Sequence, residues 1–192
     1  MDSIWSGSLA AFRERVAGSD PVPAGVSAAA VTAAFALGLL TKVLGICARR
    51  KGFAGDPKRV IAMIESAQRE SAILQRAADQ DIAAFEHYMK SRALGQPDLR
   101  AAIEIPMDAV HAAGVGLDLC VEAAGLVHAF VAADLGAAAA LLASAIQAML
   151  LSVDFNCRQL GSSELPNANR QLEKLALEQA ETVRHRVLEI IG

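Results

Sequence analysis

Two long runs of alanine and other apolar residues limit what this chain can fold into. They cover residues 24–47 and 135–153, and only a few polar side chains interrupt them. Hydrophobic residues make up 54% of the 192 residues but aromatic residues only 4%, so the apolar excess is mostly alanine. Alanine favours helices and gives a sheet little to pack, and no strand-length segment alternates polar and apolar residues. We therefore predict an all-α fold: residues 1–192 form a single-domain helical bundle of about five to seven helices, with long alanine-rich core helices.

A membrane-spanning role for these runs has to be weighed against burial in a bundle. Lys42 interrupts the first run before about 18 apolar residues accumulate. The second run carries Ser144, Gln147 and Ser152, and neither run has an aromatic belt. The N-terminus also lacks the basic and apolar regions of a signal peptide. We expect buried helices, no membrane partner and a cytoplasmic protein.

Charge and cysteine usage narrow the classes of partner. The net charge is −3, and acidic and basic residues are interspersed, which argues against a broad nucleic-acid-binding face. Cys47, Cys120 and Cys157 stand apart in apolar surroundings, without the spacing of a zinc site. We predict that they are reduced core residues and that the protein holds no metal.

Helix periodicity and helix breakers predict the element boundaries. Pro21 and Pro23 separate a short amphipathic helix from the first long one, and Asp56 caps the next helix with Pro57 in its first turn. We expect a kink or a new helix start at Asp134. The expected helices cover residues 3–16, 24–47, 58–94, 99–103, 106–131, about 134–159 and 170–191, with Asn169 capping the last.

Four segments in order along the chain carry a resemblance. The segment "PVPAGVSAAAVTAAFALGLLTKV" has a proline, a glycine and an alanine-rich helix, and "ADQDIAAFEHYM" supplies Asp81 and Phe85. "EIPMDAV" contains Pro106, and "ADLGAAAALLASAIQAMLLSVDFN" runs from Asp134 to Asn156. Over about residues 20 to 160 the chain resembles the cyclodeaminase/cyclohydrolase family, which includes formiminotetrahydrofolate cyclodeaminase and methenyltetrahydrofolate cyclohydrolase. The resemblance implies an all-helical homodimer that binds a tetrahydrofolate derivative as substrate near the subunit interface.

The chain also departs from the family pattern. The family's glycine run appears as Pro23-Ala24-Gly25-Val26-Ser27, so side chains stand where bare backbone would approach a ligand. Its Leu-Pro-Lys segment is replaced by "LGQP", and its Gly-Asn pair reads Val127-His128. These departures leave room for a diverged member that acts on another substrate or binds without catalysis.

The resemblance and the chemistry of ring opening together select the candidate site residues. Opening a methenyl folate needs a base for water and an acid for the departing nitrogen. Asp81 is the preferred carboxylate, because Asp79 lies roughly 200° away around the same helix. A solvated Asp81 and a merely capping Asp134 are the structural alternatives. The candidate catalytic residues are Asp81, Asp134 and His128, and the candidate substrate-binding residues are Pro23, Gly25, Ser27, Arg50, Lys51, Phe85 and Asn156.

Three of these candidates have equally simple structural interpretations. Arg50 and Lys51 follow the first long helix, where cations bind either a folate tail or the helix C-terminus. Asn156 either binds the pterin edge or bridges two helices.

The preferred reaction is hydrolysis of 5,10-methenyltetrahydrofolate to 10-formyltetrahydrofolate. Cyclodeaminase action, which releases ammonia from 5-formiminotetrahydrofolate, is the first alternative, and a non-catalytic scaffold is the second.

Overall fold

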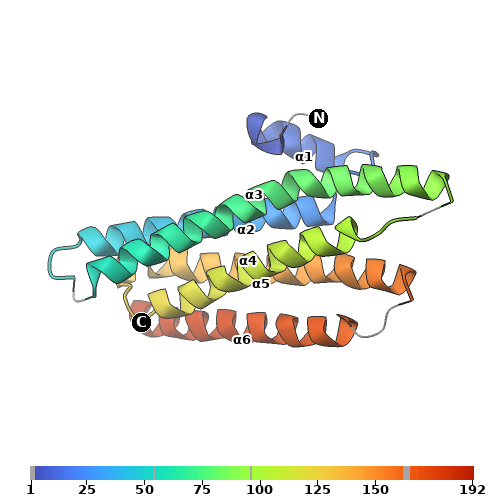
Figure 1. Cartoon of the computed structure of the whole chain (residues 1–192). Coiled ribbons are helices and arrows are strands. Elements are labelled where there is room, and N and C mark those ends of the chain that lie inside the picture. The colour runs from blue at the N-terminus through green and yellow to red at the C-terminus, as the bar shows by residue number, and fades with distance from the viewer. Residues whose placement is uncertain (1–2, 54, 96, 162–164) are drawn as a thin grey trace.

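The computed structural model describes residues 3–53, 55–95, 97–161 and 165–192, which form a bundle of long, roughly antiparallel helices (Figure 1). No strand occurs in these ranges, which confirms the all-α prediction. A 3-10 turn, η1, precedes six α-helices in the described residues. The elements are η1 (Ile4–Ser6), α1 (Leu9–Ala17), α2 (Gly25–Arg49), α3 (Pro57–Ala93), α4 (Ala101–Ala123), α5 (Ala129–Gln159) and α6 (Leu165–Ile191).

Helices α2 and α5 are the alanine-rich core that the sequence predicted. Helix α2 packs against α3 and α5, α4 packs against α3 and α5, and α6 covers α5. Small side chains let these helices approach closely: a methyl group added at Gly116 of α4 would lie 2.6 Å from a terminal carbon of Leu37. By length and composition α2 and α5 are also apolar enough to cross a membrane, and 56% and 50% of their apolar windows are buried in the bundle.

The helices around Pro106 and Asp134 differ from the sequence-based expectation. The helices expected over 99–103 and 106–131 are one helix, α4, which begins at Ala101 and ends at Ala123. Pro106 does not open a helix but lies inside α4. Its missing N–H would have bonded the carbonyl of Ala102 four residues earlier, and Asn156 Nδ2 of α5 donates to that carbonyl instead, at 2.8 Å. Helix α5 begins at Ala129, so Asp134 lies within a continuous helix rather than at a kink or start.

The chain ends also differ in detail from the expectation. The predicted first helix is divided into η1 and α1, and Ser8 caps α1 by accepting a hydrogen bond from the Ala11 N–H at 3.1 Å. Helix α6 begins at Leu165, so Asn169 lies inside it and donates to Asp154 Oδ1 at 2.5 Å. The predicted cap at Asp56 is confirmed: its Oδ1 accepts from the Lys58 N–H at 2.9 Å. All three cysteines are buried, as predicted.

Candidate functional site

A cavity of about 710 Å³ opens at the end of the bundle where α2 and α4 begin and α3 and α5 end. In Figure 1 these four helix ends meet near the α3–α4 and α5–α6 connections. The approach to α2 supplies Pro21, Val22, Ala24, Gly25 and Val26, and α3 supplies Asp81, Phe85, Tyr88, Met89 and Arg92. The start of α4 supplies Leu99 and Ala102, and α5 supplies Leu151, Ser152, Phe155, Asn156 and Gln159.

Asp81 is the one acidic side chain among the described residues that line this cavity. The Ser27 hydroxyl donates to its Oδ2 at 2.8 Å. Burial raises the pKa of the Asp81 carboxyl above its usual range, and hydrogen bonds from the Ser27 hydroxyl and backbone N–H offset part of that rise. Asp81 is therefore a carboxyl group that gains and loses its proton closer to neutral pH than an exposed aspartate.

Asp81 also completes the start of α2. Ala24, at the N-cap position, has no side chain that accepts a hydrogen bond, so the first N–H groups of α2 need other partners. The carboxyl of Asp81 provides one for the N–H of Ser27 from a neighbouring helix. The tertiary contact thus explains why a helix begins here without a conventional capping residue.

Asp79 faces a different part of the molecule, as the helical spacing predicted. Its Oδ2 accepts from the Ser3 hydroxyl at 2.7 Å, and its Oδ1 accepts from the Ile4 N–H at 2.8 Å. Trp5 Nε1 donates to the Gln75 carbonyl at 3.0 Å and reinforces the same contact. Asp79 holds the N-terminal segment, and Asp81 is directed to the cavity.

The rest of the α3 wall continues from Asp81 at helical spacing. Phe85, Tyr88 and Met89 lie one to two turns further along, and Arg92 lies three turns along, about 16 Å by helix rise. Arg92 is the one basic side chain among the described lining residues. The cavity therefore has an acid at one end, aromatic and apolar side chains between, and a cation at the other end.

Asn156 bridges two helices, as one of the two sequence-based interpretations expected, and it also lines this cavity. Its Nδ2 atom donates a hydrogen bond to the Ala102 carbonyl, and Asn156 lines the cavity together with Phe155. The amide oxygen takes no part in this contact and is the part of the side chain that can accept from a ligand donor.

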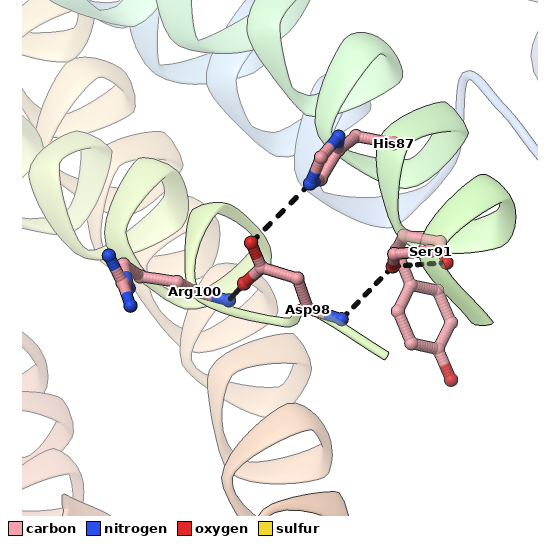
Figure 2. Close-up of polar contacts among 5 residues, drawn as sticks. His87, Ser91, Asp98 and Arg100 are labelled. Carbon is pink, nitrogen blue, oxygen red and sulfur yellow. Dashed lines mark hydrogen bonds and ion pairs between the residues drawn. The ribbon is translucent and has the colours of Figure 1, made fainter. Parts of the chain in front are cut away.

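Figure 2 shows the polar contacts that hold the α3–α4 connection beside the cavity. The Asp98 N–H donates to Ser91 Oγ at 3.0 Å, Asp98 Oδ1 accepts from the Arg100 N–H at 3.0 Å, and His87 Nε2 lies 3.4 Å from Asp98 Oδ2. The Arg100 N–H, with His87 second, holds the pKa of Asp98 below its usual value. These contacts fix Leu99, the buried residue that closes this side of the cavity.

Four of the predicted site residues lie at the opposite end of the bundle. Arg50 and Lys51 follow the last turn of α2, and Gly25 begins it, so about 36 Å of helix separates them. Within one chain, these cations therefore do not share a site with the turn formed by Pro23–Ser27. His128 precedes α5 and stacks on Phe130 with ring centroids 6.4 Å apart. Asp134 accepts from Lys42 Nζ at 2.7 Å on the surface.

Two other predicted residues support the cavity from behind. Pro23 is buried between Val22 and Ala24, which line the cavity. Ser27 is completely buried and reaches the cavity through its bond to Asp81. Gly25 and Phe85 line the cavity directly, as expected.

The sequence analysis missed Tyr88, Met89 and Arg92 on α3 and Leu151 and Phe155 on α5. The α3 residues share the helical face of Asp81, at seven, eight and eleven positions along, so extending that periodicity would have found them. Leu151 and Phe155 are 72% and 63% exposed, and only the packing of α5 shows that they border a cavity. Within the described residues, no three His, Cys, Asp or Glu side chains are grouped as a metal site.

Comparisons with known proteins agree with this architecture. The model of the family described as Formiminotransferase-cyclodeaminase matches residues 8–174. The crystal structure of formiminotetrahydrofolate cyclodeaminase from Thermotoga maritima superposes with a TM-score of 0.83, over 98% of each chain. Its sequence is 22% identical, so this likeness establishes a shared fold. The search of curated proteins gave no significant match.

Proposed function

Because the chain belongs to the formiminotransferase-cyclodeaminase family, we propose that it is an enzyme of one-carbon metabolism whose substrate is a tetrahydrofolate derivative bound beside Asp81. The observation that carries the proposal is the partly buried Asp81 carboxyl at one end of a cavity whose other end bears Arg92. Its buried free cysteines are compatible with a cytoplasmic enzyme.

The polarity of the cavity matches the polarity of a folate. The reacting carbon lies between two nitrogens and is electron-poor, so a carboxylate stabilises it. The aromatic ring between the reacting carbon and the glutamate tail can stack on aromatic side chains such as Phe85 and Tyr88. The glutamate tail itself is anionic. Arg92, about 16 Å from Asp81 along α3, is the side chain placed to bind that tail.

The leading reaction is cyclodeamination of 5-formiminotetrahydrofolate, because the protein with the similar fold carries that activity. The formimino group reacts as its protonated, cationic form, whose nitrogen carries two hydrogens. N10 attacks the formimino carbon, a C–N bond to N10 forms, and the exocyclic C–N bond breaks. Asp81 takes the N10 proton and returns it to the departing nitrogen, which leaves as ammonia, and the positive charge stays on the methenyl product. One carboxyl with a raised pKa suits both steps, since it has to accept and release a proton near neutral pH.

Hydrolysis of 5,10-methenyltetrahydrofolate, which the sequence favoured, is the second candidate. Water adds to the methenyl carbon, Asp81 takes one of its protons, and that proton passes to the ring nitrogen as its C–N bond breaks. The second proton of the water is released to solvent as the hydroxyl oxygen becomes the formyl carbonyl. The same cavity and the same carboxyl serve this reaction. The two reactions change the absorbance of the methenyl compound in opposite directions, because cyclodeamination forms that compound and hydrolysis consumes it.

The methenyl absorbance therefore tests the proposal and distinguishes the two reactions. We expect the wild type to produce the absorbance from 5-formiminotetrahydrofolate with release of ammonia. Asp81→Asn should lower kcat by about 100-fold or more, as loss of a general acid–base does. Asp79→Asn is the matched control, because it removes an aspartate two residues away that contacts the N-terminal segment. Equal rates for wild type and Asp81→Asn would contradict the role of Asp81.

A non-catalytic or diverged member remains the competing hypothesis, and the altered glycine turn around Gly25 favours it. Calorimetric titration with folates decides between them. Binding without turnover of either substrate would support a binding protein, and no binding at millimolar folate would contradict any folate site.

We also propose that the protein is a homodimer that pairs through α5. On α5, Phe130 is 85% and Phe155 63% exposed, and Leu141 and Leu151 are also exposed. Positions 130 and 155, 137 and 148, and 141 and 144 are spaced symmetrically about one point, and the first two pairs hold identical residues. Two antiparallel copies of α5 would therefore place Phe130 against Phe155 of the partner subunit, as a two-fold interface requires.

This arrangement bears directly on the site. Arg50 and His128 lie at one end of the bundle, and the cavity lies at the other end. A two-fold axis at the middle of α5 would bring the Arg50 and His128 end of one subunit toward the cavity of its partner. Sedimentation of Leu141→Glu, with Leu177→Glu on α6 as control, tests it: we expect a monomer from the first and a dimer from the second. A monomeric wild type at micromolar concentration would contradict the proposal.

A further inference from the structure

Ser27 occupies an unusual position behind the Asp81 carboxyl. It lies in the first turn of α2 and is completely buried. Its Oγ atom is 2.8 Å from Asp81 Oδ2 and 3.1 Å from the carbonyl oxygen of Ala78 on α3. A hydroxyl group has one hydrogen, so Ser27 can donate to only one of these two acceptors at a time.

We propose that Ser27 is a positioning residue that holds Asp81 in both protonation states by exchanging its hydrogen-bond partner. When Asp81 is ionised, the Ser27 hydroxyl donates to Oδ2. When Asp81 is protonated, its own O–H donates to Ser27 Oγ, and the Ser27 hydroxyl turns to the Ala78 carbonyl. One proton is added to Asp81, Ser27 keeps its hydrogen, and each hydrogen has an acceptor in both states.

The burial of Ser27 makes this exchange necessary. A hydroxyl with no access to water has to find its partners within the protein, and leaving it unpaired is costly. Among the described lining residues, Arg92 is the only other charged group, three turns along α3, and α2, α4 and α5 contribute none. Asp79 is directed to the N-terminal segment. Ser27 is therefore the side chain placed to respond to the charge of Asp81.

This inference rests on the proposed function in one respect: an Asp81 that takes and returns a proton during turnover needs the same orientation before and after. Ser27 supplies that orientation without touching the substrate. The same argument explains why a serine, with both a donor and an acceptor, suits the position better than an alanine of nearly the same size.

The test is the titration of the Asp81 carboxyl in the full chain, followed by carbon NMR after selective labelling of aspartate and assigned with Asp81→Asn. We expect Ser27→Ala to raise the pKa of Asp81 by about one unit, a tenfold change in the ratio of its two forms, because the hydrogen bond that Ser27 donates to the ionised carboxylate is stronger than the one it accepts from the protonated form. Ser27→Thr, which keeps the hydroxyl, should return it toward the wild-type value. Thr32→Ala is the control, since it removes a hydroxyl that bonds the Ala28 carbonyl of its own helix.

Activity provides a second measurement. In Ser27→Ala we expect kcat to fall about tenfold and its pH profile to move with the pKa of Asp81, while KM changes little. An Asp81 pKa unchanged in Ser27→Ala, or changed equally in Thr32→Ala, would overturn the inference. If the wild type turns over no folate but the pKa shifts as expected, the proposed function fails and the role of Ser27 stands.

Discussion

The contact between Asn156 and the start of α4 makes a quantitative prediction about stability. Pro106 has no N–H, so the Ala102 carbonyl lacks the hydrogen bond that the next turn of a helix normally supplies. Asn156 Nδ2 replaces it at 2.8 Å, from a helix 54 positions away in the chain. Asn156→Ala should therefore leave a partly buried carbonyl unpaired.

The expected cost is about 2 kcal/mol, within the range of about 1–3 kcal/mol for removing one partner of a buried hydrogen bond. For a chain of this size, that loss lowers Tm by about 4–8 °C. Urea unfolding followed by circular dichroism measures the free energy of unfolding, and unchanged m-values show that the same surface is exposed.

The informative experiment is the double-mutant cycle with Pro106→Ala. Alanine at 106 restores the N–H that bonds the Ala102 carbonyl within α4. That carbonyl then has a hydrogen-bond partner even when Asn156 is absent. We expect Asn156→Ala to cost about 1 kcal/mol less in the Pro106→Ala background than in the wild type. Equal costs in both backgrounds would refute the argument that Asn156 replaces the bond that Pro106 removes.

Three further predictions concern the cavity and the core. The pKa of folded Asp81 is raised by burial, so its contribution to stability is present below the pKa of an unfolded aspartate, about 4, and is lost as pH rises through the folded pKa. Asp81→Asn should therefore gain stability relative to the wild type as pH rises. Urea unfolding at several pH values measures this, and a pH-independent difference between the two free energies of unfolding would contradict it. Gly116→Ala should destabilise by about 1–3 kcal/mol through overpacking, whereas Gly114→Ala, with open space around it, should stabilise by about 0.5–1 kcal/mol from helix propensity, as measured by thermal unfolding. Arg92→Ala should raise the Kd for a folate by about tenfold, with Lys90→Ala as the control outside the cavity; calorimetry that finds both variants equal to wild type would remove the tail-binding role.

The fold class and several local orientations follow from the amino-acid sequence. Alanine content and helical periodicity predicted α2 and α3 to within about two residues. The spacing of Asp79 and Asp81 predicted that they face different sides, and the structure confirms it. These properties depend on neighbours within one or two helical turns, and such neighbours are visible in the sequence.

Tertiary structure alone decided which helix ends meet. The sequence grouped Arg50 and Lys51 with Gly25 and Ser27 as substrate-binding candidates, but the length of α2 separates the two cations from the start of that helix. Arg92 takes the position instead, because α3 runs antiparallel to α2 and ends where α2 begins. Asn156 likewise found its partner only through the packing of α5 on α4. Helical spacing fixes the face of a residue on its own helix, whereas its distance from another helix depends on the lengths and directions of both, which are settled only when the bundle packs.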